Sequence, residues 1–252
     1  MDELHFMLSA DDTAIYAAYN SGDLDYIDTV PNDEISSLNG INPEFGILDN
    51  LGTYYIGFNV NDPIFDGKTE EQAAKMREAI SLLVDRQFIV ENVGQTGHIA
   101  VAESVQQDVA LLGINLEIKS EDWNVFLQDR KDGNFTIARE GWLADYNDPV
   151  NMLEIFTSDS GNNDMQLGKG TPVSSSPDWT AYDELIGQVR TTTDFAARVD
   201  LMHQAEDMLM DTWAVIPIYY YNDVYMQKSN VTGVYATVYG MKYFMYATKS
   251  AQ

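Results

Sequence analysis

The spacing of apolar residues switches between strand-like and helix-like periods along the first sixty residues. Apolar positions from Ile15 to Tyr19 share one helical face, and they stand between an Asp-Asp-Thr cap and Gly22, a residue typical of helix ends. Residues 46–60 are rich in aromatic and β-branched residues, which predicts a long strand or strand pair. Shorter strands are expected at 5–8 and 23–29, and a second helix at 31–38.

The pattern from residue 60 to residue 140 predicts alternating helices and strands. Thr69 stands at the N-cap of an amphipathic helix, and Gly113 ends a later one. Residues 114–118 alternate apolar with polar positions, as a half-buried strand does, and residues 135–139 form the next expected strand. Such alternation is typical of parallel α/β architecture. The helices expected here cover 70–83, 86–93, 99–112 and 123–131.

The last hundred residues begin with a polar loop and end in strands. Residues 158–178 are rich in Ser, Gly, Asn and Pro, which predicts a long surface loop. Amphipathic helices are expected at 182–189 and 195–213, and strands at 215–221, 225–226 and 243–247. The chain has no internal repeat, and no apolar run is long enough to span a bilayer.

The balance of charges limits the classes of partner. The chain has 14 Lys and Arg against 40 Asp and Glu, a formal charge of −26 that repels nucleic acid and anionic membranes. With no cysteine, disulfides, thiolate metal sites and cysteine nucleophiles are excluded. A hydrophobic content of 45% is enough for a core. We therefore expect a globular protein with no nucleic-acid partner and, from its acidic start, no signal peptide in this chain.

Residues 141–149, Gly-Trp-Leu-Ala-Asp-Tyr-Asn-Asp-Pro, carry the densest candidate chemistry. They follow an expected strand and precede a helix that begins near Val150, and open α/β sheets bind their ligands at such corners. Trp142 or Tyr146 can cover an apolar group, while Asp145 can bind a cation. A structural role is the open alternative: a buried Trp, with Asp and Asn capping the next helix.

Motifs of the common enzyme classes are absent. The chain has no nucleophile elbow, phosphate loop, dinucleotide fingerprint or zinc-protease helix. The three histidines are far apart and none has a second one at metal-ligand spacing. Asp145-x-Asn147 begins like a calcium loop, but Pro149 occupies the third ligand position. We therefore expect no catalytic residue, no metal and no cofactor.

A larger set of short motifs carries a family resemblance. The set comprises Gly52-Thr53-Tyr54-Tyr55, Leu83-Val84-Asp85-Arg86, Glu121-Asp122-Trp123, Phe126-Leu127-Gln128-Asp129-Arg130, residues 138–149, Ser160-Gly161-Asn162-Asn163-Asp164 and residues 216–221. It resembles the C-terminal half of bacterial oligopeptide-binding proteins, the family 5 extracytoplasmic solute-binding proteins of peptide ABC importers. The resemblance covers nearly the whole chain.

The resemblance implies an α/β fold of the periplasmic-binding-protein-like class (type II), mainly one lobe with part of the second. Residues 1–59 and 223–252 would belong to lobe one, and residues 60–222 would form lobe two, the ligand-binding α/β lobe. Such a receptor closes on an extended peptide and holds its main chain by strand-like hydrogen bonds. The implied partners are an oligopeptide ligand and the membrane permease of an ABC importer.

The resemblance also implies roles for single residues. Asp145 matches a carboxylate that pairs with the α-ammonium group of the peptide. Gly141 and Trp142 match the strand that binds the ligand backbone, and Trp123 matches a pocket aromatic. Positions that can meet a peptide C-terminus are matched by Arg130, Arg139 and His98; for Arg139, an ion pair with an acidic side chain is the alternative. With Tyr146 and Asn147 of the central stretch, these residues form the expected ligand-binding set.

The chain departs from the family pattern in length. Family members are about twice as long, with segments before Met1 and several tens of residues more between Gly97 and His98. The full-length form would be extracytoplasmic, in the periplasm or as a cell-surface lipoprotein, and the shortened chain is expected to self-associate through exposed apolar surface. Two alternatives stay open: a hydrolase that acts on a cationic or sugar substrate through paired carboxylates, and an inert binding lobe.

Overall fold

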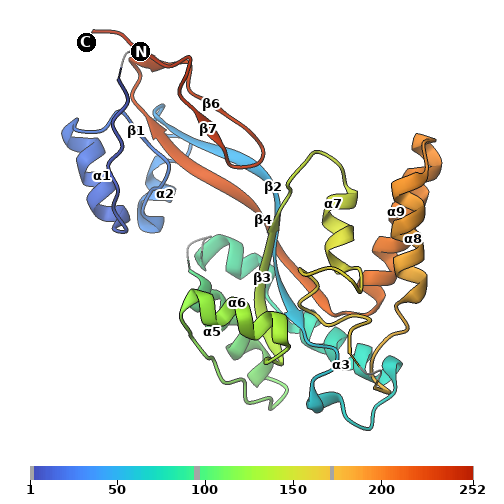
Figure 1. Cartoon of the computed structure of the whole chain (residues 1–252). Coiled ribbons are helices and arrows are strands. Elements are labelled where there is room, and N and C mark those ends of the chain that lie inside the picture. The colour runs from blue at the N-terminus through green and yellow to red at the C-terminus, as the bar shows by residue number, and fades with distance from the viewer. Residues whose placement is uncertain (1–2, 94–96, 171–172, 252) are drawn as a thin grey trace. The chain divides into compact units, whose positions relative to one another are not determined.

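The structure of the protein is a computed structural model that describes residues 3–93, 97–170 and 173–251. The chain divides into two compact units (Figure 1). Unit 1 comprises Met1–Gly52 and Tyr220–Gln252, and unit 2 comprises Thr53–Tyr219. The assignment of these units to the two expected lobes stays a prediction.

The helices and strands of the described residues have the following bounds. In chain order they are α1 Asp12–Ser21, β1 Tyr26–Ile27, α2 Asn32–Leu38, β2 Phe45–Phe58, the 3-10 turn Pro63–Phe65, α3 Glu70–Leu83, α4 Arg86–Phe88, the π-helical turn Ile89–Val93, α5 His98–Ala110, α6 Trp123–Asp132, β3 Ile137–Leu143, α7 Val150–Leu153, the 3-10 turn Glu154–Phe156, α8 Thr180–Thr191, α9 Phe195–Asp211, β4 Val215–Gln227, β5 Val231–Thr232, β6 Tyr235–Ala236, β7 Lys242–Tyr243 and β8 Thr248–Lys249.

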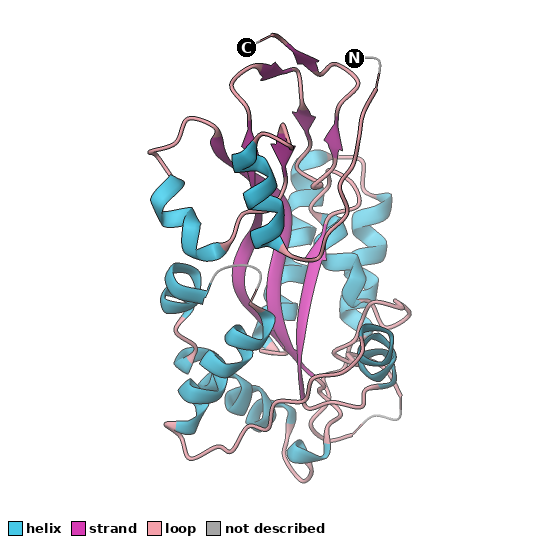
Figure 2. Cartoon of the chain, turned by 90° about the vertical axis from the view of Figure 1, so that its left-hand side faces the viewer, coloured by secondary structure: helices cyan, strands magenta, loops and turns pink. Residues whose placement is uncertain are grey.

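The long strands of the four-stranded sheet position the candidate site. The strand order is β1-β4-β2-β3, and Figure 2 shows the long strands side by side. β3 therefore lies at one edge of the sheet, and its outer side pairs with no strand of the described residues. Unpaired backbone N–H and C=O groups on such an edge can bind another extended chain, although the Arg139 carbonyl of β3 already accepts a hydrogen bond of 3.2 Å from Arg130.

The main hydrophobic core belongs to unit 2. Helices α8 and α9 pack against each other (Figure 1), and both contribute side chains to this core. Tyr182 and Ile186 of α8 and Ala205 of α9 are fully buried in it. The start of α9 is fixed by the Asp194 side chain, which accepts a hydrogen bond of 2.8 Å from the Ala197 N–H group.

Unit 1 has a smaller core around a two-residue strand. β1 pairs antiparallel with the C-terminal end of β4, with Tyr26 opposite Gln227. Helix α1 begins where Asp11 accepts a hydrogen bond from the Ala14 N–H group, and ends at Gly22, whose φ of 90° suits a residue without a side chain. The buried residues of this core are Tyr19, Ile27, Val30, Leu38 and Met226.

Most of the expected elements form, but two expected strands do not. Residues 114–118 alternate in burial as the sequence predicts, yet they are irregular. The Leu116 carbonyl accepts a hydrogen bond of 2.5 Å from the Gln106 side chain, so the segment binds a helix rather than a strand. Between β2 and β4 the described chain therefore has one strand, β3, instead of the expected helix–strand alternation. Residues 5–8 are also irregular, and they are exposed.

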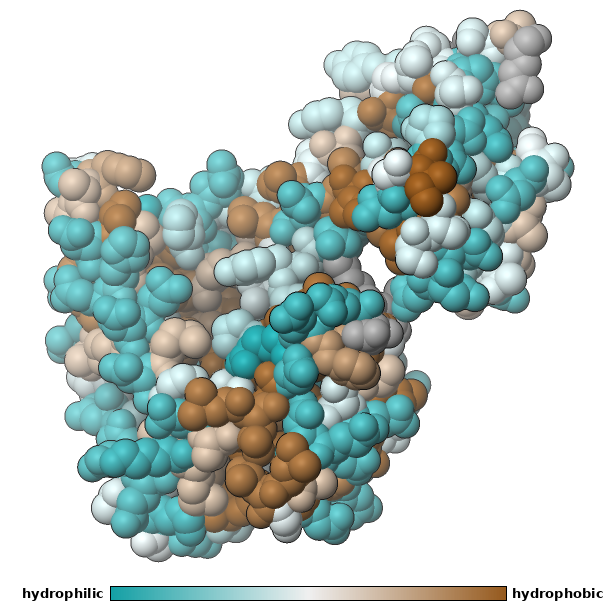
Figure 3. Space-filling model, turned by 180° about the vertical axis from the view of Figure 1, so that it is seen from behind, coloured by the Kyte–Doolittle hydropathy of each residue, from teal (hydrophilic) through white to brown (hydrophobic). Residues whose placement is uncertain are grey.

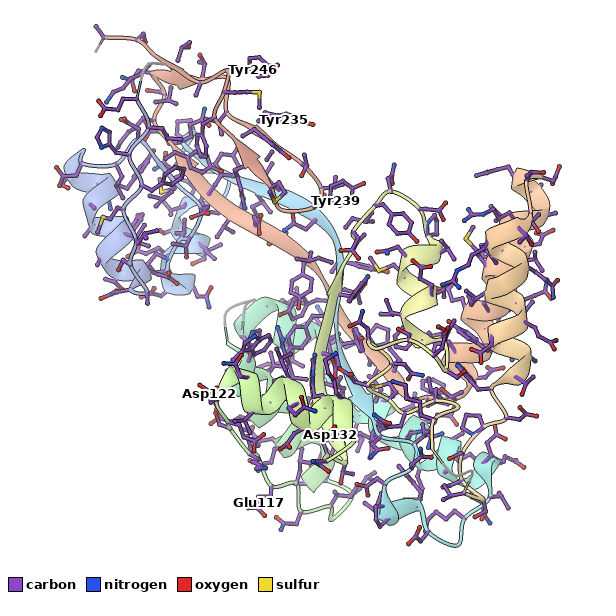
Figure 4. All side chains as sticks on the ribbon, viewed as in Figure 1. Glu117, Asp122, Asp132, Tyr235, Tyr239 and Tyr246 are labelled. Atoms are coloured by element: carbon purple, nitrogen blue, oxygen red, sulfur yellow. The ribbon has the colours of Figure 1, made fainter. Side chains whose placement is uncertain are left out.

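Exposed hydrophobic side chains gather on both units. Figure 3 shows hydrophobic residues gathered on the rear face of unit 2. Between the start of α3 and residue 112, the exposed large hydrophobic residues are Leu82, Phe88, Val90, Ile99, Leu111 and Leu112. In unit 1, Figure 4 shows Tyr235, Tyr239 and Tyr246 on the same side of the segment that carries β6 and β7. Tyr235 and Tyr246 are exposed and Tyr239 is half-buried; we name these three tyrosines the tyrosine face. No described helix has the length and apolar composition that a membrane span requires.

Candidate functional site

The candidate site lies at the end of β3 and in the loop that follows it, within unit 2. Gly141 and Trp142 belong to β3, and Asp145, Tyr146 and Asn147 belong to the loop. All three loop residues are exposed. The loop thus presents its polar groups to solvent, while the strand behind it stays within the sheet.

The end of this loop is fixed by Asp148. Its side chain accepts a hydrogen bond of 3.0 Å from the Val150 N–H group, at the start of α7, and forms an ion pair of 2.9 Å with Arg198 of α9. Burial alone would raise the pKa of Asp148, but these two partners lower it below its ordinary value. Asp148 is therefore ionised at neutral pH and ties the loop to the helical layer.

A single buried carboxamide ties the other parts of the loop together. Asn151 of α7 is only 2% exposed. Its Oδ1 atom accepts a hydrogen bond of 3.0 Å from the Trp142 indole and another of 2.9 Å from the Asp145 N–H group. The strand residue Trp142 and the loop residue Asp145 are therefore held by the same oxygen atom.

The Asp145 carboxylate lies on an open pocket with a volume of about 350 Å³. Trp142, Asn151, Glu154, Asp159 and Arg190 also line this pocket. Within the described part of the chain, the Asp145 carboxylate has no ion pair and no hydrogen bond. It can therefore bind a cationic group without breaking an existing contact.

Glu154, on the same pocket, is already bound. It accepts hydrogen bonds from the Tyr146 hydroxyl and, at 3.0 Å, from Arg190. Burial opposes ionisation, but these bonds and one from Asn151 lower the pKa of Glu154. The same Glu154 contact and partial burial raise the pKa of Tyr146. Glu154 thus fixes Tyr146 and Arg190, whereas Asp145 is open.

Arg139 lies in a second group of site residues, nearer the start of β3. Its guanidinium carbon is 5.3 Å from the ring centre of Tyr54 and 5.8 Å from that of Trp123. Arg139 Nη2 is 3.2 Å from His98 Nε2, and the His98 ring stacks on Tyr54. Arg139 also acts electrostatically on the nearby Glu140 carboxyl, so both its role toward a ligand and the alternative of a charge pair stay predictions. This cluster of cation and aromatic rings can receive an anion.

Arg130 stands apart from that cluster because it is bound to two buried carboxylates. It forms ion pairs with Glu140 and, at 3.2 Å, with Asp164. Its side chain is 12% exposed, and its guanidinium lies 5.0 Å from the ring centre of Phe126. Arg130 therefore joins α6, β3 and the loop after α7, and its charge is already matched.

Burial dominates the acid–base behaviour of those carboxylates. It raises the pKa of Glu140 to about 8, although Arg130 acts to lower it. Burial also raises the pKa of Asp164, against the charges of Arg130 and two lysines. One oxygen of each carboxylate has no hydrogen-bond partner in the described chain, which is consistent with partial protonation of the pair.

The expected site residues thus form two groups along one strand. Asp145, Trp142 and Tyr146 gather around Asn151 and Glu154, and Arg139, His98 and Trp123 gather around Tyr54. Gly141 lies between the groups on β3, Asn147 is exposed beside the first, and Arg130 belongs to neither. Asn151 could not be recognised from the sequence, because a polar residue in the first turn of a helix is usually solvent-exposed.

Comparisons with known proteins agree on one family. A sequence model described as "Bacterial extracellular solute-binding proteins, family 5 Middle" matches residues 1–100 and 94–164. The chain is 25% identical over 300 residues to the dipeptide-binding protein DppE of Bacillus subtilis, covering 93% of this chain and 52% of DppE. It is 34% identical over 148 residues to the oligopeptide-binding protein OppA of the same organism, covering 58% of this chain and 26% of OppA. The matched part of the chain thus spans about half the length of DppE and about a quarter of the length of OppA.

A solved structure supports the fold. A periplasmic oligopeptide-binding protein of Borrelia burgdorferi superposes with a TM-score of 0.78 at 18% identity, covering 97% of this chain and 58% of that one. This likeness confirms the expected fold class, that of periplasmic binding proteins. The alignment with DppE is longer than the chain itself, so it contains gaps in this chain.

Proposed function

The chain belongs to the family 5 bacterial extracellular solute-binding proteins, and from this premise we propose that it is the ligand-binding part of a peptide receptor of an ABC importer. Its relatives are named as dipeptide- and oligopeptide-binding proteins. The observation that carries the proposal is the open Asp145 carboxylate on the pocket at the end of an edge strand. The role is binding and not catalysis.

Asp145 is the proposed partner of the peptide α-ammonium group. A carboxylate without a protein partner, next to the half-buried Trp142, provides a charge-assisted hydrogen bond to an ammonium ion. Glu154 cannot take this role as easily, because Tyr146 and Arg190 already bind it. Tyr146 and Asn147 would lie along the first residues of the ligand.

The free edge of β3 is the proposed binding surface for the peptide main chain. An extended peptide can add to an exposed strand edge through backbone hydrogen bonds, with Gly141 and Trp142 contributing here. Arg139 and His98 would meet the ligand carboxylate, with Trp123 covering it.

We propose the remaining assignments on the same basis. Residues 60–222 form lobe two, and residues 1–59 and 223–252 belong to lobe one. The partner is the membrane permease of an ABC importer, and the location is extracytoplasmic, which agrees with the word "extracellular" in the family description. Self-association of the chain through its exposed apolar surface also stays a prediction.

The ammonium role of Asp145 can be tested by calorimetry with a pentapeptide of neutral side chains. Asp145→Asn keeps the shape and removes the charge, so affinity for the free peptide should fall by roughly 2 to 4 kcal/mol, while an N-acetylated peptide should lose little. Asp159→Asn is the matched control, since Asp159 lines the same pocket but its carboxylate already accepts a bond from Thr157. Equal binding of free and acetylated peptides by the unaltered protein would refute the proposed role.

A further inference from the structure

Asn151 occupies a position that decides the geometry of the proposed ammonium site. One carboxamide oxygen can accept two hydrogen bonds, and Asn151 Oδ1 accepts both of its bonds from site residues. One donor is the Trp142 indole and the other is the Asp145 backbone. No acceptor capacity of this oxygen is left for solvent or ligand.

The surroundings of Asn151 keep that oxygen in place. Asp148 fixes the start of α7 through the Val150 N–H group and Arg198. The neighbours Val150 and Leu153 are buried in the main core, so α7 cannot turn without exposing them. The Asn151 side chain therefore extends from a fixed helix to the loop. It holds the loop at Asp145, between the strand before it and Asp148 at its end.

The residue type matters as much as the position. A leucine of similar volume would leave the Trp142 indole and the Asp145 N–H group without their acceptor at a part-buried position. An aspartate would keep the acceptor but add a second negative charge next to Asp145. A neutral carboxamide satisfies both donors and leaves Asp145 as the open anion of the pocket.

We infer that Asn151 is a positioning residue, which sets Trp142 and the Asp145 carboxylate in their ligand-binding arrangement before the ligand arrives. The inference rests on the proposed role of Asp145. Because both bonds join groups of the chain itself and involve no ligand atom, binding would not have to form them, and a loop that is already held in this way increases affinity. Asn151 contributes through the two residues that it holds and need not touch the ligand.

A double-mutant cycle between Asn151→Leu and Asp145→Asn tests the inference. The readout is the ratio of affinities for a free and an N-acetylated pentapeptide with neutral side chains. Asn151→Leu should lower this ratio by roughly ten- to a hundredfold, toward the value of Asp145→Asn, and should change it little further when Asp145 is already Asn. A fold defect alone would weaken both peptides alike. Independent, additive effects on the ratio would overturn the inference.

Nuclear magnetic resonance of the unliganded protein supplies a second readout that does not depend on peptide binding. The Trp142 indole N–H signal, assigned by Trp142→Phe, and the Asp145 amide signal should both exchange slowly with solvent. Both should lose that protection in Asn151→Leu and keep it in Asn151→Asp, which retains the acceptor. Fast exchange of either signal in the unaltered protein would overturn the inference, and this holds even if Asn151→Leu does not fold.

The two experiments separate the inference from the proposed function. If the unaltered protein binds free and acetylated peptides equally, the role of Asp145 fails, whatever Asn151 does. If it prefers the free peptide and Asn151→Leu keeps the same preference, only the positioning role fails.

Discussion

Arg139 and His98 lie side by side, with Arg139 Nη2 3.2 Å from His98 Nε2. Burial and the positive charge of Arg139 both lower the pKa of His98 below its ordinary value of 6.5. The ring is therefore neutral at pH 7, and its Nε2 can accept the hydrogen bond that Arg139 donates. A ligand carboxylate at this pair would favour the protonated ring instead.

Peptide binding should therefore become tighter as the pH falls from 7 to 6, a range in which the peptide α-amino group is already protonated. The bound carboxylate raises the pKa of His98, so the complex takes up a proton that the free protein does not hold. The effect should be absent for peptides with an amidated C-terminus and for the variant His98→Gln. Calorimetry in two buffers of different ionisation enthalpy measures the proton uptake directly. The same uptake with an amidated peptide would contradict this account.

Arg130→Met should destabilise the fold rather than weaken peptide binding alone. Removing the guanidinium leaves Glu140 and Asp164 buried without their cation, which costs about 3 to 5 kcal/mol. The matched control is Arg190→Met, because Arg190 is 51% exposed and its pair with Glu154 should contribute less than about 1 kcal/mol. Urea unfolding at pH 9, above the pKa of about 8 of Glu140, measures the stability of both variants with this carboxylate ionised. Equal stability of the two variants would show that the buried ion pairs do not support the fold.

The stability of the protein should fall as the pH rises from 5 to 9. Burial raises the pKa of Glu140 from 4.5 to about 8, so the folded protein holds a proton that the unfolded chain has released. This contribution is fully present below pH 4.5 and is lost as the pH rises through about 8. Glu140→Gln should flatten this part of the curve. Denaturant titrations between pH 5 and 9 measure the free energy of unfolding of both proteins. If Glu140→Gln loses stability with pH as steeply as the unaltered protein does, the raised pKa of Glu140 is wrong.

Gly57→Ala should destabilise the protein by about 1 to 3 kcal/mol. A Cβ atom at Gly57 would lie 1.9 Å from the Met165 Sδ atom, and Met165 is buried on all sides. Gly187→Ala is the control, because a Cβ atom there meets nothing within 4 Å and helix α8 should gain up to about 1 kcal/mol. Chemical denaturation compares the two variants. A neutral Gly57→Ala would mean that β2 and Met165 separate easily.

The fold was predictable from sequence where the pattern of one segment decides its structure. Residues 46–60 are rich in β-branched and aromatic residues, and β2 forms there between two partner strands. Asp194 and Thr69 cap their helices through bonds to residues only three positions away. Residues 114–118 have an equally good alternation but no neighbouring strand, and the Gln106 side chain binds their backbone instead. A strand depends on a partner that its own sequence does not contain.

The same distinction applies to the candidate site. Asp145 and Trp142 stand in a contiguous stretch whose chemistry can be recognised along the chain. Asn151 is important only because its oxygen lies within hydrogen-bond distance of both, which follows from the path of α7. The sequence alone does not distinguish the role of Arg130 from that of Arg139. The structure does, because Glu140 and Asp164 form ion pairs with Arg130.

The tyrosine face has a consequence for the protein in solution. Residues 224–252 contain no Asp or Glu, so the 40 carboxylates of the chain all lie in the rest of the sequence. At about 0.01 M salt the repulsion between chains reaches roughly 30 Å and keeps such faces apart, whereas at about 1 M it reaches only roughly 3 Å. The protein should then behave as a charge-stabilised colloid: chains repel one another and stay monomeric at low salt, and they attract one another at high salt. Its second virial coefficient, measured by light scattering, should change sign from positive to negative as salt is added.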